Sequence, residues 1–312
     1  MGHRVRVLTQ SSSSDPADDH GFEVLRRPAA GELRRAILWA DVFSQNNISL
    51  RTVWPLIFTH RSWWVTTQTW LGRSERSPGL HGKLKRFVLG FARNLYISQA
   101  IASHVGHPGV IVGNPYDAET FRLIGEIPRD RDIVFLGRLV SDKGCDTLIE
   151  ALALLQQEGQ VFRTTIIGDG PEKSKLEAQA RRLGLEQQVQ FAGKLSGQEL
   201  ATELNRHRIM AIPSRWNEPF GIVALEGMAC GCIPVVSAGG GLQEATGGCG
   251  ISFPNGDAVG LSRALLEAHT LPPEHRETMV AHTKKFHPTT IAQRYLEEFE
   301  KGLHEEAIRR IS

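Results

Sequence analysis

Two glutamates in the stretch PSRWNEPFGIVALEGMACG, residues 213–231, have the spacing expected for recognition of a long polar ligand. Glu218 precedes an apolar run and Glu226 lies inside it, where an unpaired carboxylate is costly to bury. If a helix begins near Phe220 or Gly221, the two glutamates lie about 10 Å apart along the chain. Carboxylates accept hydrogen bonds from vicinal hydroxyls, so one glutamate can hold a sugar and the other a ribose. The alternative is that Glu218 caps the helix and Glu226 pairs with a neighbouring base.

A basic pair and free backbone amides would supply an anion site between the two glutamates. The segment RLVSDKG places Arg138 and Lys143 in one short loop, directly before a predicted helix. Two cations and helix N-terminal amides suit a diphosphate. The free amides of the helix after NEPFG would face the same space, and they belong to Gly221, Ile222 and Val223. Taken alone, such a basic pair is more commonly solvated surface.

An alternation of strand and helix patterns positions these loops. From residue 126 on, five short apolar, β-branched runs are each followed by a loop and a helix-period segment. The runs are DIVFLG, FRTTIIG, QVQFAG, RIMAIPS and CIPVVSA. They predict an α/β fold with a doubly wound parallel sheet, in which ligands bind at the carboxyl ends of the strands. Gly168, after FRTTIIG, allows close backbone approach there, although a lone G-x-G pattern commonly marks only a turn.

The first 125 residues predict a second, smaller domain of the same kind. Six candidate strands are HRVRVLT, GFEVLRR, WADVFSQ, SWWVTTQ, NLYIS and GVIVG, with helices over LRTVWPLIF and KLKRFVLGFA. The charged, proline-containing segment GEIPRDRD suggests a linker, and Asp257 suits the N-cap of the helix AVGLSRALLEA. We therefore expect domains at residues 1–125 and 126–286, followed by a closing helix within residues 287–312.

Composition narrows the class of protein. With 312 residues and 41% hydrophobic content, the chain can form about two domains that each bury a core. No run approaches the ~18 apolar residues of a membrane span, and the start of the chain lacks an apolar signal-peptide core, so we expect a cytoplasmic protein. We expect no nucleic-acid partner and no metal. The cysteines show neither zinc-site spacing nor a disulfide framework, and they are Cys145, Cys230, Cys232 and Cys249.

Basic residues concentrate in the first part of the chain. Residues 1–125 carry 15 Lys and Arg against 9 Asp and Glu, while the remainder carries 21 against 25. Between Arg73 and Arg93 there are six basic residues and a single acid, Glu75. Two interpretations are open for residues 73–93: a basic amphipathic helix in peripheral contact with an anionic membrane surface, or a solvated helix face.

At these motifs the sequence resembles the retaining nucleotide-sugar glycosyltransferases of family four, whose GT-B fold has two facing Rossmann-like domains. The resemblance covers nearly the whole chain and is specific in the second half. There GRLVSDKGCDTLIEALALL, IIGDGPEKSKLE, VQFAGKLSGQEL, IPSRWNEPFGIVALEGMACGCIPVVSAGGGLQE and ISFPNGD follow the family's order and spacing. It implies that Arg138 and Lys143 bind the donor diphosphate. It also implies that Glu218 touches the transferred sugar and Glu226 the ribose hydroxyls.

The resemblance implies further roles for backbone groups. Those from Phe220 to Val223 would contact the sugar and phosphates, and those near Lys194 and Leu195 would contact the base. Transfer in this family retains the anomeric configuration and needs no metal or other cofactor. The last helix would cross back onto the first domain.

The chain departs from the family in two places. HRVRVLT resembles the family's second strand, which normally follows a first strand, a glycine-rich loop and a helix. A sheet without that central strand would expose unpaired backbone, so we expect a shortened form with impaired activity. Where the family often has a histidine at the donor sugar, this sequence offers Gln68, beside Thr67. Glutamine donates hydrogen bonds but carries no proton to a leaving group, although electrostatic stabilisation can sustain transfer without it.

Other polar and aromatic residues in the first domain have open roles. His60 is a candidate substitute for the missing histidine, although a lone histidine at a strand edge is more commonly structural. Three tryptophans, at positions 63, 64 and 70, belong either to an acceptor pocket or to the core.

The leading interpretation is a hexosyltransferase that uses a UDP- or GDP-sugar and a hydroxyl of a glycan or lipid-linked acceptor. The donor would bind the second domain and the acceptor the first, in the cytoplasm or at the inner membrane face. One alternative is a catalytically impaired relative that binds nucleotide sugars or acts as a scaffold. It is favoured by the missing strand and Gln68 and opposed by the intact donor motifs. A dinucleotide-dependent oxidoreductase would need a glycine fingerprint after the first strand, and no such pattern is present.

Overall fold

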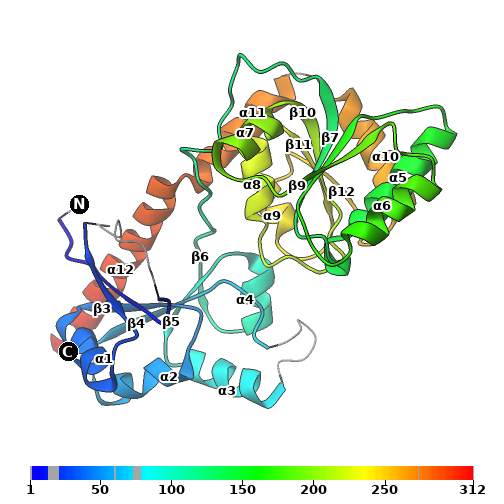
Figure 1. Ribbon diagram of the computed structural model, residues 1–312. Helices are drawn as coiled ribbons and strands as arrows, with labels where there is room; N and C mark the ends of the chain where they lie inside the picture. Colours follow the sequence, from blue (N-terminus) through cyan, green and yellow to red (C-terminus); the bar gives the residue numbers. More distant parts are fainter. Residues whose placement is uncertain (1, 13–20, 60, 73–78, 273, 312) are drawn as a thin grey trace. The chain divides into compact units, whose positions relative to one another are not determined.

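The computed structural model describes residues 2–12, 21–59, 61–72, 79–272 and 274–311. The chain forms two compact units (Figure 1). Unit 1 comprises Met1–Leu95, His107–Val110 and Leu296–Ser312, and unit 2 comprises Tyr96–Gly106 and Ile111–Tyr295. The chain thus passes between the units near Leu95, Gly106, Val110 and Tyr295. The sequence suggested boundaries after residues 125 and 286.

Unit 2 is built on a six-stranded sheet in the order β12-β11-β10-β7-β8-β9, with all its neighbouring strands parallel. The strands are β7 (Arg131–Leu136), β8 (Thr164–Ile167), β9 (Val189–Gly193), β10 (His207–Ile212), β11 (Ile233–Ser237) and β12 (Ile251–Phe253). The chain winds outward from β7 to β9 and then from β10 to β12, so the strand order reverses between β7 and β10. Doubly wound sheets bind ligands at the carboxyl ends of the strands at this point. The five predicted strands are confirmed, and β12 is an additional one.

Helices cover both faces of this sheet. Figure 1 shows α5 (Cys145–Gln157), α6 (Lys173–Arg182) and α10 (Ala258–Thr270) on one face, and α7 (Gly197–Asn205) and α8 (Ile222–Ala229) on the other. Apolar side chains of α5 and α10 pack against the sheet and are fully buried, among them Leu148, Ile149, Leu152, Leu261 and Leu265. The predicted cap of α10 is confirmed, because Asp257 accepts a hydrogen bond of 2.9 Å from the amide of Gly260.

Three further α-helices lie in unit 2. They are α4 (Gln99–Val105), α9 (Leu242–Thr246) and α11 (Glu274–Thr283). The start of α12 (Pro288–Ile311) also belongs to this unit, up to Tyr295.

Unit 1 contains a four-stranded sheet in the order β3-β4-β5-β6. Its strands are β3 (Val42–Asn46), β4 (Ser62–Thr67), β5 (Arg93–Tyr96) and β6 (Gly109–Ile111), and its helices are α1 (Ala30–Trp39), α2 (Leu50–Val53), a 3-10 helix (Trp54–Phe58) and α3 (Gly79–Leu89). The part of α12 from Leu296 packs here. The Trp64 ring meets Phe299 edge-on at 5.1 Å, and Arg93 pairs with Glu305 at 2.8 Å.

A separate parallel pair, β1 (Arg6–Thr9) and β2 (Glu23–Arg26), stands beside this sheet in the same unit. Among the described residues β1 pairs only with β2, and β3 pairs only with β4 within its four-stranded sheet, so each has one unpaired edge. A groove of about 1060 Å³ is lined by β1, by β3 and by residues of α1 and α12. Val5 and Val7 line it and are 52% and 36% exposed. Open strand edges and exposed apolar side chains therefore occur together in unit 1.

Candidate functional site

The loops that follow β7 and β10 are pressed together at the point where the strand order reverses. Gly144, in the first loop, has a φ of 67°, and a side chain there would overlap the carbonyl of Pro213 in the second. The amides of Arg215 and Trp216 donate to the carbonyl of Asp142 at 2.9 and 3.2 Å. A glycine and two backbone hydrogen bonds thus fix the two loops against each other.

Lys143 and Glu218 meet at this junction. The Lys143 ammonium lies 2.5 Å from Glu218 Oε1, which also accepts a hydrogen bond of 2.8 Å from the Ser214 hydroxyl. The two charged side chains are 22% and 13% exposed, and the ammonium also lies 5.7 Å from the centre of the Trp216 ring. The structure therefore brings together a cation and a carboxylate that stand 75 residues apart in the chain.

Arg138 lies on the same loop as Lys143 but extends into solvent. Its side chain is exposed, and within the described part of the chain its guanidinium has no hydrogen-bond or ion-pair partner. The loop around it is ordered by a backbone hydrogen bond of 3.0 Å from the amide of Val140 to the carbonyl of Arg138. One cation of the predicted pair is thus held by a carboxylate, and the other is free to meet an anion.

The first turn of α8 presents backbone amides next to Glu218 in the sequence. Gly221 is the N-cap residue with a φ of 118°, and a side chain there would overlap Leu242. Phe220 is buried, with its ring 5.4 Å from that of Phe286, so the turn before the helix is anchored in the core of unit 2. Ile222 is 38% exposed and Val223 is half-buried. Amides of a first turn have no intrahelical partner and are available to an anion.

Glu226 lies in the second turn of α8 and is partly buried. Burial raises the pKa of its carboxyl to about 7, and the negative charge of Asp117 adds to the effect. No basic side chain in the described chain lies within ion-pair distance of Glu226. The structure thus shows no base paired with Glu226 among the described residues, and its carboxyl is held at a cost that another partner would reduce.

The remaining predicted donor residues lie at neighbouring strand ends. The amide of Gly168 donates to the carbonyl of Gly193 at 2.8 Å, and a side chain at Gly168 would overlap the carbonyl of Gly137. The close packing of the loops after β7 and β8 is thus enough to require glycine at 168. Lys194 and Leu195 directly follow β9, where the first is exposed and the second half-buried.

The candidate residues of the first domain lie in unit 1. The amide of Gln68 donates to Asn47 Oδ1 at 2.8 Å, which fixes the backbone at the end of β4. Trp64 and Trp70 are 3% and 8% exposed, which places both in the core. Trp63 is half-buried and donates to Gln45 at 3.1 Å. His60 lies outside the described residues.

Several positioning residues were not predicted from the sequence. Asn255 donates to Asn217 Oδ1 at 3.0 Å and accepts from the amide of Gly239 at 2.9 Å, so it ties the loop bearing Glu218 to the strands on its other side. The hydroxyl of Ser98 donates to the carbonyl of Pro219 at 2.6 Å. The NGD turn that contains Asn255 was visible in the sequence, but its contacts cross almost 40 residues of chain.

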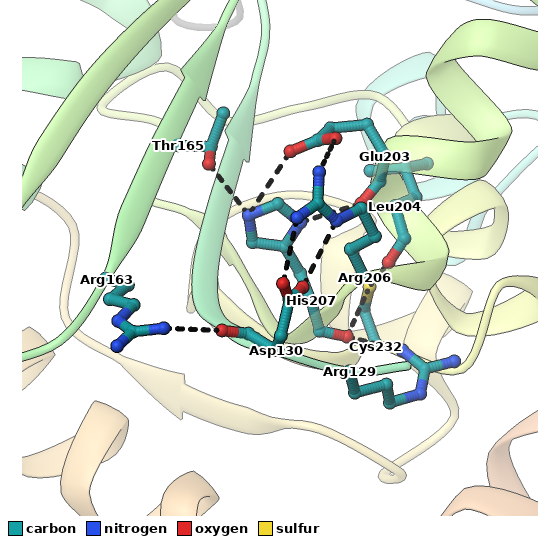
Figure 2. A network of polar contacts seen from close by, with 9 residues as sticks. All are labelled: Arg129, Asp130, Arg163, Thr165, Glu203, Leu204, Arg206, His207 and Cys232. Atoms are coloured by element: carbon teal, nitrogen blue, oxygen red, sulfur yellow. Dashed lines mark hydrogen bonds and ion pairs between the residues drawn. The ribbon is translucent and has the colours of Figure 1, made fainter. Parts of the chain in front are cut away.

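A second polar network lies at the opposite, amino ends of the strands (Figure 2). His207, the first residue of β10, is fully buried, with Nδ1 2.7 Å from the carbonyl of Glu203 and Nε2 2.9 Å from the Thr165 hydroxyl. Burial lowers the pKa of its imidazole to about 4. Arg206 donates twice to Asp130, at 3.1 and 2.9 Å. Both ring nitrogens of His207 have partners, so the network is structural.

Metal sites, disulfides and membrane-spanning helices are absent from the described residues. These residues contain no group of three or more His, Cys, Asp or Glu side chains placed to hold a metal ion. All four cysteines are buried and free. None of the helices in the described ranges combines the length and apolar character needed to cross a bilayer.

Known proteins resemble part of the sequence and the fold of the chain. Over 159 residues the chain is 35% identical to a glycogen synthase of Mycobacterium tuberculosis. This alignment covers 50% of the present chain and 38% of the glycogen synthase. Over 167 residues it is 37% identical to a D-inositol 3-phosphate glycosyltransferase of Jonesia denitrificans, covering 48% and 39% of the two chains. These matches thus span less than two-fifths of each relative.

Solved structures match over nearly the whole chain. A glycosyltransferase from Rickettsia africae superposes with a TM-score of 0.80 at 14% identity, over 97% of this chain and 91% of that one. Anabaena HepE in complex with UDP and glucose gives a TM-score of 0.73 at 17% identity, over 96% and 100%. At such identities the likeness concerns the fold alone, which is the α/β fold with two Rossmann-like domains expected from the sequence.

The family model for "Glycosyl transferases group 1" matches residues 117–286. That range is more than half of the chain, and it contains Lys143, Glu218 and Glu226. The protein therefore belongs to the group 1 glycosyl transferases and has the GT-B fold.

Proposed function

We propose that the protein is a retaining hexosyltransferase that moves a hexose from a UDP- or GDP-sugar to a hydroxyl of a glycan or lipid-linked acceptor. The observation that carries the proposal is the junction of Lys143 and Glu218 at the carboxyl ends of β7 and β10. A cation and a hydroxyl-binding carboxylate lie together there, beside an exposed guanidinium and the first turn of a helix. We place the reaction in the cytoplasm.

Lys143 and Arg138 hold the diphosphate, and the amides of Gly221, Ile222 and Val223 complete its site. Charge-assisted hydrogen bonds from ammonium and guanidinium groups are the strong ones for phosphate oxygens, and helix N-termini add to them. As the bond to the sugar breaks, negative charge grows on the leaving diphosphate. Preorganised cations stabilise that charge, which is why the proposal includes no metal ion.

Glu218 and Glu226 hold the two ends of the donor. Glu218 accepts from a hydroxyl of the transferred sugar, while Lys143 exchanges part of its contact with that carboxylate for a phosphate oxygen. Glu226 accepts from the ribose hydroxyls, which supply the hydrogen bonds that its partly buried carboxyl lacks. The backbone near Lys194 and Leu195 and the close approach at Gly168 serve the base and phosphate end. The presence of UDP and glucose in the HepE structure supports this class of donor.

Unit 1 supplies the acceptor side. Gln68 directly follows β4, and its side-chain amide can donate hydrogen bonds but has no proton to give to a leaving group. The acceptor hydroxyl is therefore activated by the leaving diphosphate and by the electrostatics of the site rather than by this side chain.

A second candidate is a catalytically impaired relative that binds nucleotide sugars. The observation in its favour is the pair of unpaired strand edges in unit 1, the unit that would receive the acceptor. The two candidates share the donor site and differ only in turnover.

Measurements of donor binding and of turnover test the proposal. Calorimetry with UDP and with GDP, together with a thermal-shift screen of nucleotide sugars, shows whether a donor binds the folded state, because such a ligand raises the melting temperature. Donor hydrolysis and transfer assays then separate an active enzyme from a binding protein. The double variant Arg138→Ala/Lys143→Ala should lose binding, while Lys175→Ala, an exposed lysine on α6, should retain it. Equal binding by both variants would exclude the assigned donor site.

A further inference from the structure

Helix α3 in unit 1 exposes a continuous apolar stripe. Leu80, Leu84, Phe87 and Phe91 are 87%, 50%, 66% and 72% exposed. The spacing of four and three residues places Leu80, Leu84 and Phe87 on one face of the helix, and Phe91 lies in the turn that directly follows it. The rings of Phe87 and Phe91 meet edge-on at 5.3 Å, so the stripe is a preformed surface rather than a set of isolated side chains.

The opposite face of α3 fastens the helix to unit 1. Leu89 is fully buried and Gly82 is buried, and both lie about half a turn from the stripe. His107 Nε2 lies 2.8 Å from the carbonyl of Arg86, which adds a polar contact on the inner side. The exposed stripe is therefore not an unpacked core face, because the core face of this helix is already occupied.

The charged side chains of α3 have a single sign. The segment from Gly79 to Ala92 contains Lys83, Lys85 and Arg86 and no Asp or Glu. Lys83 is exposed and lies about 60° from the centre of the stripe, and long basic side chains can extend beside an apolar surface to reach anionic groups. An apolar face on a helix that carries basic residues and no acidic one complements a surface that is apolar inside and negatively charged outside.

We propose that α3 is a membrane-contact helix that lies on an anionic bilayer surface with Leu80, Leu84, Phe87 and Phe91 in the interface. The contact needs no sugar donor, so it stands apart from the proposed transfer reaction. It would hold unit 1 at a membrane where lipid-linked hydroxyls are presented.

Vesicle sedimentation tests this proposal with the full chain. The probes are vesicles of phosphatidylcholine alone and vesicles in which about a third of the lipid is phosphatidylglycerol, at low and at physiological salt. We expect wild-type protein to sediment with the anionic vesicles at least tenfold more strongly than with the neutral ones. Salt should weaken the binding, because it screens the basic groups.

Two double variants separate the apolar and the charged contributions. Leu84→Gln/Phe87→Gln changes side chains that are at least half exposed and should reduce binding at least tenfold. Lys83→Glu/Lys85→Glu should abolish the preference for anionic vesicles. Val161→Gln and Lys175→Glu alter an exposed apolar residue and an exposed lysine of unit 2, and they should bind like wild type.

Three outcomes would overturn the proposal. One is equal sedimentation of wild type with the two kinds of vesicle, and another is unchanged binding by both double variants. The third is self-association of wild type without lipid, seen by light scattering and lost in Leu84→Gln/Phe87→Gln, which would assign the stripe to a second copy of the chain. Circular dichroism of each variant shows whether it is folded. Retained donor binding shows that the site of unit 2 is intact.

Discussion

Replacing Glu226 with glutamine tests how the fold of unit 2 holds an unpaired carboxyl on helix α8. The pKa of this group is raised from 4.5 to about 7, chiefly by burial and secondly by the charge of Asp117. Each pKa unit corresponds to 1.36 kcal/mol, so the free energy at stake is about 3 kcal/mol as an order of magnitude. Glutamine keeps the shape and cannot ionise.

The direction of the effect follows from proton binding. Between about pH 4.5 and pH 7 the folded chain retains a proton on Glu226 that the unfolded chain has lost, so stability falls as pH rises through this range. Glu226→Gln removes that fall. The difference in unfolding free energy between variant and wild type should therefore grow by about 3 kcal/mol from pH 4.5 to pH 8 and stay flat outside that window.

The unfolding free energy of the variant must be compared with that of wild type at each pH, because the protonation of His207 changes stability with pH in the opposite direction to that of Glu226. Burial lowers the pKa of His207 from 6.5 to about 4, so its contribution to stability falls as pH decreases through that range. In the wild-type profile the two slopes cancel over much of the same interval. Only a comparison of variant with wild type at each pH isolates the carboxyl.

The assay is urea unfolding followed by circular dichroism at several values between about pH 4.5 and pH 8.5. Glu267→Gln, which makes the same replacement at an exposed glutamate on α10, is the matched control for the substitution itself. Parallel profiles for Glu226→Gln and wild type would refute the reasoning, since they would mean that the carboxyl is as well solvated in the folded state as in the unfolded one.

Three further predictions concern the junction of the loops and the buried network. Lys143→Ala should lower kcat for transfer by about a hundredfold or more with little change in melting temperature, whereas Lys175→Ala should leave kcat unchanged; a normal rate in the first variant would remove Lys143 from the site. Gly144→Ala should cost well over ~2 kcal/mol in urea unfolding because of both its left-handed backbone and the overlap with the facing loop. Gly159→Ala, also left-handed but with open space around it, should cost only about 1–2 kcal/mol, and equal losses would contradict the overlap. His207→Gln should flatten the loss of stability between about pH 6.5 and pH 4, and an unaltered acid profile would show that this imidazole is not the group responsible.

Much of the fold was predictable from the sequence because short apolar runs alternate with helix-period segments. The same alternation placed Lys143 and Glu218 at one edge of the sheet, since loops after adjacent parallel strands meet there. The strand β12 was missed because three residues carry too little pattern, and α4 was missed because seven residues span only two turns. Helix α1 was also missed, although its buried Leu33, Ala36 and Ile37 follow the helical period.

The finer features of the site depend on contacts between distant parts of the chain. Ser214 precedes Glu218 by four residues, yet only the fold of the loop shows that its hydroxyl reaches the carboxylate. The neighbour that raises the pKa of Glu226 is Asp117, more than a hundred residues earlier. No local pattern of apolar and polar residues encodes such a contact, so the sequence could locate Glu226 but could not describe its surroundings.

The separation of β1 and β2 from the four-stranded sheet affects which part of unit 1 unfolds first. Within the described ranges these two strands form no ladder with any other strand, so they depend on each other and on side-chain packing. Such a pair is marginally stable by itself. Transient opening of β1 therefore breaks fewer hydrogen bonds than opening of β7 or β10, each of which is bonded on both sides. On gradual warming, β1 and β2 should exchange their amide hydrogens and admit proteases before the central strands of unit 2.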